Sequence, residues 1–338
     1  MWAVGWIAEK EDFWADAGLT NLSVQEGEGS DDTAAGAVTG DYPVSSHHLA
    51  AGVDYWEGID AGDIYIFGLN KRWSEFGLMW PEQQYGDSLD DLHAVTDTDE
   101  YEWVCSSGNA LQTWDIINAE YDLDQTQDEP KVMSHAETAT AIENGEVDIV
   151  YGSIDTVRRN TESVAENDDR FAEIDEMVVR GVSNNIHTLI GYPFVVNGDY
   201  YREHEEVIDD FLTAFLEGYS AAAHWAFTNP DDAIDFVIEI TPDLQIPREY
   251  LANELRACIV TEIGLDGFEE GVGTLDTDAL SESIDLLEPI LAPDEGIPDV
   301  DELELTEPSD RADFKSFSDE EEGEIRDYAA DYFEAYGI

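Results

Sequence analysis

The chain has 338 residues, of which 43% are hydrophobic and 11% aromatic, so it is long enough for two domains and apolar enough to fold. Its formal net charge is −66, from 80 Asp and Glu against 14 Lys and Arg. Acids spread along the whole sequence predict a solvated acidic coat of the halophilic kind. They exclude nucleic acid as a partner, because no basic stripe exists to meet phosphates.

The two cysteines, Cys105 and Cys258, are too few for a disulfide framework and form no CxxC metal pattern. We expect no metal site and no cofactor. No run of about 18 apolar residues predicts a membrane span, and no signal peptide is visible. The sequence opens on a helix-like segment, Trp2–Ala8, with no strand before it, so we expect the first strand of a domain to be missing.

Strand and helix patterns alternate along the first 80 residues, which predicts a parallel or mixed α/β sheet. Gly18 and Gly40 each end a predicted helix, and Ser30 is placed to cap one. In chain order the predicted elements are a helix over 6–14, a strand over 22–24, a helix over 31–38, a strand over 42–45, a helix opened by Ser46-His47-His48, and strands over 64–69 and 76–80.

The segment 101–117 is the most informative stretch of the chain. Tyr101–Cys105 is aromatic and β-branched enough for a strand, and Ala110, Leu111, Trp114 and Ile117 recur at helical spacing. Ser106, Ser107, Gly108 and Asn109 connect the two. A helix that starts in this way leaves backbone N–H groups unpaired and adds the positive end of its dipole. The turn therefore predicts a socket for an anion or a hydrogen-bonding ligand.

The rest of the chain continues the alternation and then becomes mostly helical. An apolar stripe of Val207, Phe211, Leu212, Phe215 and Tyr219 predicts a buried helix. The other predicted elements are strands over 131–133, 147–150, 177–182 and 186–196, helices opened by Ser134–Glu137, Tyr151–Asp155 and Asn229-Pro230, a surface segment over 292–318, and an acidic amphipathic helix over 318–336.

Several segments occur in an order that resembles a known family. Gly5–Leu19 is similar to that family's first helix and its Ala-Gly-Leu ending, and Val24–Ser30 to the strand and turn that follow. Further similar segments are Val38–Val44, Asp87–Leu92, Ala141–Asp148, Phe211–Gly218 and Asn229–Ala233. In this order, over most of the chain, they resemble the NMT1/THI5-like substrate-binding proteins of ABC importers, of the SsuA/ThiY type.

This resemblance implies an α/β fold of the two-lobed, type II periplasmic-binding-protein class, with a ligand cleft between the lobes. Lobe 1 would hold residues 1–82 and 192–338, without its N-terminal strand, and lobe 2 residues 83–191. The implied function is extracytoplasmic capture of a small polar or aromatic ligand by lobe closure, and its delivery to ABC permease subunits. The ligand would be a sulfonate, nitrate or a thiamine precursor. We expect the full-length protein at the cell surface, held by a lipid anchor.

The predicted ligand contacts lie at strand ends and at the segments that carry the resemblance. Each of these residues has a structural alternative, because small polar residues also cap helices, aromatic residues also fill cores, and a lone histidine is often structural. The predicted set is Gly5, Trp6, Ser30, Ser45, Ser46, His47, Ser106, Ser107, Gly108, Asn109, Tyr151, Ser153, Asp155 and His187.

Two other functions remain open at this stage. A pyrimidine synthase of the THI5 group has the same fold, but that group carries a cysteine cluster, whereas this chain has two distant cysteines. A stand-alone ligand sensor is the other alternative, and a fused output domain would favour it. No GxSxG, HExxH or P-loop motif occurs, so we expect the chain not to be an enzyme.

The acidic composition makes a direct prediction about salt. The Debye length falls from ~10 Å at 0.1 M salt to ~3 Å at 1 M, so self-repulsion in the folded chain is screened at high salt. We predict that the melting temperature rises steeply between about 0.1 and 2 M KCl. A melting temperature that does not change with salt would contradict the halophilic interpretation.

Overall fold

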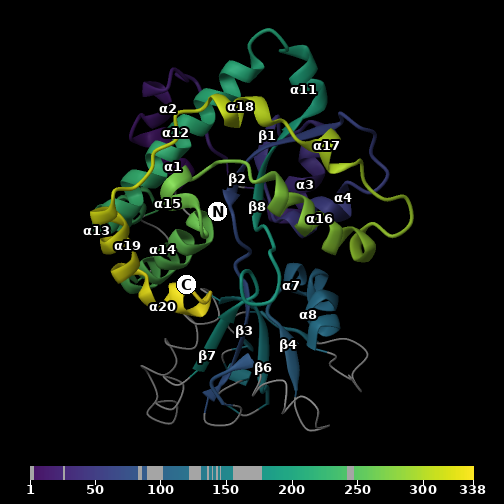
Figure 1. The fold of residues 1–338 in the computed structure, drawn as a ribbon, viewed down its shortest axis with the longest axis vertical. Helices are drawn as coiled ribbons and strands as arrows, with labels where there is room; N and C mark the ends of the chain where they lie inside the picture. The colour runs from purple at the N-terminus through teal and green to yellow at the C-terminus, as the bar shows by residue number, and fades with distance from the viewer. Residues whose placement is uncertain are drawn as a thin grey trace. The chain divides into compact units, whose positions relative to one another are not determined.

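A computed structural model describes residues 4–25, 27–82, 86–89, 102–121, 131–134, 137–138, 140–141, 144, 146–154, 177–241 and 247–338 (Figure 1). The chain forms two compact units. Unit 1 consists of Met1–Trp73 and Leu189–Phe333, and unit 2 of Ser74–Thr188 and Glu334–Ile338. The strand over 76–81 lies in unit 2, whereas the sequence placed residues up to 82 in lobe 1. The lobe boundaries drawn from the sequence stay a prediction.

Unit 1 contains a three-stranded sheet in the order β1-β8-β2. Its strands are β1 (Val44–Ser46), β2 (Ile64–Lys71) and β8 (Tyr192–Asn197). β8 runs antiparallel to both neighbours, with Ser46 opposite Phe194 and Lys71 opposite Tyr192. The ends of β1 and β2 and the start of β8 therefore share one border of the sheet, which we call edge 1.

Helices cover both faces of the unit 1 sheet, which is why every β2 residue except Tyr65 is buried. Figure 1 shows α3, α4 and α16 on one side of β8, and α12 and α14 on the other. The helices are α1 (Val4–Lys10), α2 (Phe13–Asp16), α3 (Ser30–Thr39), α4 (Leu49–Tyr55), α11 (Gly198–Glu203), α12 (Ile208–Thr228), α13 (Pro230–Ile240), α14 (Arg248–Ile263), α15 (Gly267–Glu270), α16 (Thr277–Leu291), α17 (Val300–Leu303), α18 (Thr306–Arg311), α19 (Asp319–Tyr328) and α20 (Ala330–Ala335).

Aromatic rings from the sheet and from α12 form the core of unit 1. Phe194 of β8 meets Tyr219 edge-on, with ring centroids 4.9 Å apart, and Phe67 of β2 meets Phe215 in the same way at 5.8 Å. Such pairs contribute about 0.5–1.5 kcal/mol each beyond the area that they bury. The predicted stripe on α12 is thus largely correct. Val207 is the exception, since it precedes the helix and is 59% exposed.

Unit 2 contains a five-stranded mixed sheet in the order β5-β4-β6-β3-β7. Its strands are β3 (Phe76–Pro81), β4 (Trp103–Cys105), β5 (Lys131–Val132), β6 (Ile149–Ser153) and β7 (Met177–Gly181), and its helices are α7 (Gly108–Gln112) and α8 (Trp114–Tyr121). β4 is parallel to β5 and β6, whereas β3 is antiparallel to β6 and β7. The ends of β4, β6 and β7 and the start of β3 share one border, which we call edge 2.

The predicted class, an α/β fold with strands and helices alternating along the chain, is confirmed, but several local predictions are wrong. Residues 22–24 form no strand, because the Val24 N–H donates to Glu9 Oε2 at 2.8 Å instead of to a neighbouring strand. The strand expected over 186–196 begins only at Tyr192, because the chain passes from unit 2 to unit 1 just before it. The helix expected over 318–336 is two helices that break at Ala329.

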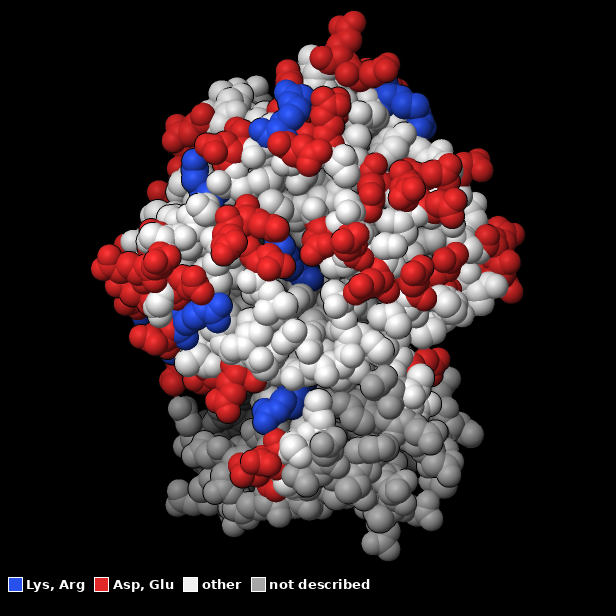
Figure 2. All heavy atoms as spheres, in the orientation of Figure 1, with Lys and Arg blue, Asp and Glu red and all other residues white. Residues whose placement is uncertain are grey.

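Asp and Glu side chains are distributed over much of the face of the molecule shown in Figure 2, with few Lys and Arg among them. Within the described part of the chain, no helix has the length and apolar character needed to cross a bilayer.

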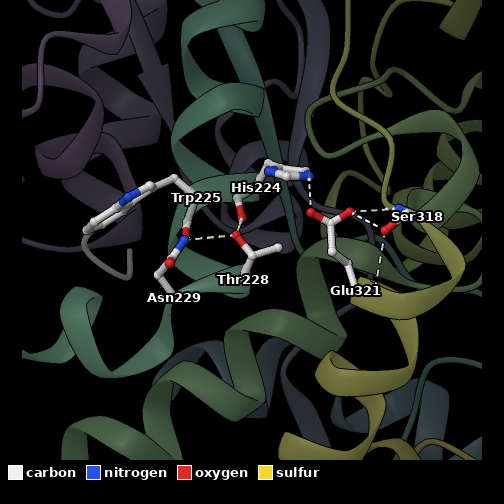
Figure 3. A network of polar contacts seen from close by, with 6 residues as sticks. All are labelled: His224, Trp225, Thr228, Asn229, Ser318 and Glu321. Atoms are coloured by element: carbon white, nitrogen blue, oxygen red, sulfur yellow. Dashed lines mark hydrogen bonds and ion pairs between the residues drawn. The ribbon is translucent and has the colours of Figure 1, made fainter.

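The start of α19 is fixed by a capping box (Figure 3). The Ser318 N–H donates to Glu321 Oε2 at 2.8 Å, and the Glu321 N–H donates back to Ser318 Oγ at 3.4 Å. Glu321 also lies 3.6 Å from Nε2 of His224 on α12, so the cap ties the two helices together. These contacts lower the pKa of Glu321, chiefly through the backbone and side-chain hydrogen bonds from Ser318.

Loss of this cap has a predictable cost. We predict that Ser318→Ala lowers the free energy of unfolding by about 1 kcal/mol, because orphan N–H groups at the start of α19 lose their acceptor. Chemical denaturation in 2 M KCl measures the change. Ser316→Ala, at an exposed position two residues earlier, is the control and should leave stability unchanged. Equal stability of the two variants would contradict the assignment.

Candidate functional site

Edge 1 carries hydroxyl groups that the fold leaves unused. Ser45 and Ser46 end β1, and neither Oγ atom, although buried, has a hydrogen-bond partner among the described residues. A buried hydroxyl without a partner costs about 1–3 kcal/mol. Both residues belong to the predicted ligand contacts, and both are placed at the sheet border where α/β folds bind ligands.

His47 follows these serines and is 1% exposed. Neither ring nitrogen has a partner within the described chain, and the ring meets Trp56 edge-on at 5.7 Å between centroids. The indole Nε1 of Trp56 is likewise buried and unpaired. His47 and Trp56 thus add three unused polar atoms to the two serine hydroxyls, all from one short segment and the end of α4.

The charge state of His47 follows from its burial. Burial, with a smaller contribution from the charge on His48, lowers the pKa of His47 to about 3. The imidazole is therefore neutral near pH 7 and offers one N–H donor and one acceptor nitrogen. Such a group can orient a polar ligand without contributing a charge of its own.

Two neighbouring residues hold this segment in place. His48 caps α4, since its Nδ1 accepts the Ala50 N–H at 3.2 Å, and the His48 N–H donates to Ser30 Oγ at 3.3 Å. The structure thus corrects the prediction that Ser30 caps α3, because Gly29 occupies that position and no side chain caps the helix. Ser30 positions the His47-His48 segment instead.

Edge 2 carries the predicted turn between β4 and α7. Ser107 caps α7 by accepting the Ala110 N–H at 3.1 Å, so this hydroxyl is in use. Ser106 is 2% exposed, and its Oγ has no partner among the described residues. A Cβ atom at Gly152 would collide with Ser106 Oγ, so the glycine of β6 makes the room that the serine occupies. Gly108 is exposed and Asn109 half-buried at the same turn.

Two predicted contacts in unit 2 are tied up within the fold. The Tyr151 hydroxyl lies 2.6 Å from Thr113 Oγ1, and burial raises the pKa of Tyr151 above its usual value. Ser153 donates to Glu75 Oε1 at 3.3 Å. Both residues lie in β6, paired with β3, whereas the sequence placed them at the start of a helix. Their roles as ligand contacts stay a prediction.

The remaining predicted contacts are dispersed. Gly5 and Trp6 lie in α1, which packs against α12, with Gly5 buried and Trp6 half-buried. The His187 N–H donates to the Val182 carbonyl at 3.4 Å, after the end of β7 in unit 2. Asp155 lies outside the described residues.

The sequence missed two polar residues near edge 1. Asn70 is 1% exposed, and both of its amide atoms lack a partner among the described residues. Trp56 was unremarkable in sequence as one of nine tryptophans. Asn70 could have been found, since it lies at the end of a predicted buried strand, where polar residues often serve a ligand.

A second hollow lies elsewhere in unit 1. A pocket of about 480 Å³ is bordered by α13, α14 and α19, with Asp231, Arg248, Arg256 and Tyr328 among its lining residues. Arg248 is ion-paired with Asp231 at 2.8 Å and also with Asp235. Because its cation is already neutralised by acids of the same helix, we assign this pocket no role.

No protein-family model matches the chain, and no curated protein matches it either. Solved structures do. The periplasmic aliphatic sulphonate-binding protein SsuA from Escherichia coli is 11% identical with a TM-score of 0.60, over 94% of this chain and 91% of that one. A ligand-binding component of an ABC-type import system from Staphylococcus aureus, with zinc bound, is 12% identical with a TM-score of 0.59, over 92% and 94%.

The chain has the fold of SsuA-type, periplasmic substrate-binding proteins. The fold class implied by the sequence is therefore confirmed. The same fold also occurs in an enzyme, since a mutant of DszB in complex with biphenyl-2-sulfinic acid is 14% identical with a TM-score of 0.51, over 91% of this chain and 94% of that one.

The buried state of His47 predicts a specific acid sensitivity. In the unfolded chain His47 takes up a proton below about pH 6.5, whereas in the folded protein it does so only near pH 3. Its contribution to stability is therefore lost as the pH falls from about 6.5 towards 3. We predict that His47→Asn reduces the loss of stability over this window, measured by denaturant unfolding at fixed salt. An identical pH profile in the variant would contradict a buried, neutral His47.

Proposed function

We propose that this chain is an extracytoplasmic solute-binding protein of an ABC importer. It captures a small polar or aromatic ligand by closure of its two units and delivers it to permease subunits. The observation that carries the proposal is the pair of unused polar clusters, one in each unit, at Ser45–His47 on edge 1 and at Ser106 on edge 2.

Chain connectivity supports this reading of both edges. β2 ends at Lys71 on edge 1 and the chain enters unit 2 at Ser74, just before β3 starts on edge 2. It returns after β7, which ends on edge 2, to β8, which starts on edge 1. Each unit thus presents its polar cluster at the border where the chain crosses, so one ligand could engage both clusters when the units close.

The ligand class follows from the groups available. Hydroxyl groups, a neutral imidazole, an indole N–H and the N-terminus of α7 all donate hydrogen bonds. These groups suit an oxygen-rich ligand, and the fold is shared with a sulphonate-binding protein. A sulfonate is therefore the first candidate, with nitrate and a thiamine-precursor pyrimidine next.

An enzyme on the same fold is the alternative. Cysteine chemistry finds no support here, because burial raises the pKa of Cys105 to about 12, so its thiol is not ionised near pH 7. Cys258 is also buried. These observations favour binding over catalysis by either cysteine.

The function is tested by ligand binding in high salt. We predict that ethanesulfonate, nitrate or an aminopyrimidine raises the melting temperature in 2 M KCl, because a ligand that binds only the folded state stabilises it by mass action. Calorimetry then gives the affinity. Turnover of a ligand, with no stabilising binding by any of the three, would overturn the proposal in favour of an enzyme.

Ser106 gives a sharper test, because its role in binding and its role in stability have opposite signs. We predict that Ser106→Ala leaves the unliganded protein as stable as before, or more stable, since it removes an unpaired buried hydroxyl. The variant should bind the ligand several-fold more weakly.

Ser220→Ala is the matched control, because Ser220 is 1% exposed and accepts the Lys315 N–H at 3.0 Å within unit 1. This variant should lose about 1 kcal/mol of stability and keep its affinity. If Ser106→Ala behaves like Ser220→Ala, Ser106 is structural.

A further inference from the structure

A buried cation lies at the same border as Ser45–His47. Lys71 is the last residue of β2, on edge 1, and is only 6% exposed, although it is one of just four lysines in the chain. Keeping an ammonium group out of water is costly. In a chain with abundant acids and few bases, a lysine retained inside the fold calls for an explanation.

Ring contacts connect Lys71 to the cluster on edge 1. The Lys71 ammonium lies 4.8 Å from the centroid of the Tyr192 ring. The other neighbour of that ring is His48, which meets it edge-on at 5.4 Å between centroids. Tyr192 opens β8, the central strand of the sheet, so its ring links the end of β2 to the segment that follows β1.

A buried acid lies behind the lysine. Glu262 on α14 is 1% exposed and accepts a hydrogen bond from the Tyr219 hydroxyl at 3.0 Å. Burial raises the pKa of Glu262 to about 8, although the charge on Lys71 and the Tyr219 hydrogen bond act in the opposite direction. Near pH 7 Glu262 is therefore mostly protonated and does not neutralise Lys71.

We propose that Lys71 is the specificity-determining cation of this site and that the ligand carries an anionic group. This inference rests on the proposed function and narrows it, since it selects organic anions such as sulfonates over neutral heterocycles. A buried ammonium attracts an anion more strongly than an exposed one, because the surrounding dielectric is low. Ser45, Ser46 and His47 then supply hydrogen bonds without adding charge.

Glu262 acts as a positioning residue that sets the charge of the cluster. As the pH rises through about 8, Glu262 ionises and the net charge of the Lys71–Glu262 pair falls from +1 to zero. Affinity for an anion should fall over the same range. The other titratable groups around the pair are Tyr219 and Cys258 behind Glu262, Tyr192 and His48 beside Lys71, and the amino terminus.

The test compares ethanesulfonate with its neutral isostere ethanesulfonamide, by calorimetry in 2 M KCl between pH 6.5 and 9.5. We predict that the wild type prefers the sulfonate at pH 7 and that Lys71→Met lowers sulfonate affinity about ten-fold or more. Wild-type affinity should fall as the pH rises through about 8. Glu262→Gln folds around a side chain of the same shape and should retain the affinity measured at pH 7 while losing this pH dependence.

The outcomes separate the two proposals. Equal affinity for the two probes, or a sulfonate affinity unchanged in Lys71→Met, overturns the role of Lys71 and leaves a solute-binding protein for another ligand class. If Lys71→Met does not fold, an unaltered pH profile in Glu262→Gln overturns the role of the pair. If no probe binds the wild type, nor does nitrate or an aminopyrimidine, the proposed function itself fails.

Discussion

A buried hydrogen-bonding atom without a partner costs a folded protein free energy, and folds rarely keep one without a reason. This chain keeps such atoms on two borders. Ser45, Ser46 and His47 lie on one, and Ser106 lies on the other. Nearby residues of the same types are fully engaged, as Ser107 and Ser30 show, so the fold is able to satisfy such groups. The functional account depends on this contrast.

Topology explains why the unused atoms gather where they do. Antiparallel pairing of β8 with both neighbours brings the ends of β1 and β2 to one border of the unit 1 sheet. In unit 2, β4 and β6 run parallel and end on the border where β3 starts. Strand ends interrupt the ladder of backbone hydrogen bonds, so side chains there can serve a ligand at little cost to the sheet. The resulting arrangement is independent of the acidic coat, which faces water.

Much of the fold could be predicted from local pattern. The turn from β4 through Ser106 and Ser107 into α7 was visible because small polar residues separate two apolar periodicities. The strand β2 and the helix α12 were visible as long buried runs. Long-range partners defeated the other predictions. Val24 bonds a side chain of α1 rather than a strand, and β6 extends through Ser153 because β3 pairs with it.

The candidate site was only half visible for the same reason. Serines after a strand advertise a turn, so Ser45, Ser46 and Ser106 could be found. The burial of Lys71 and Glu262 could not, because a lysine at a strand end and one acid among 80 have no distinguishing local pattern. Only the packing of β2 against α14, with Tyr219 of α12 bonded to Glu262, shows that these charges lie inside unit 1.

The claim that one ligand engages both borders is tested most directly by amide hydrogen exchange with and without saturating ethanesulfonate in 2 M KCl. The account predicts that the ligand slows exchange in two separate segments, 45–50 on edge 1 and 106–111 on edge 2, and leaves α13 unchanged. Protection confined to one of the two segments would contradict it.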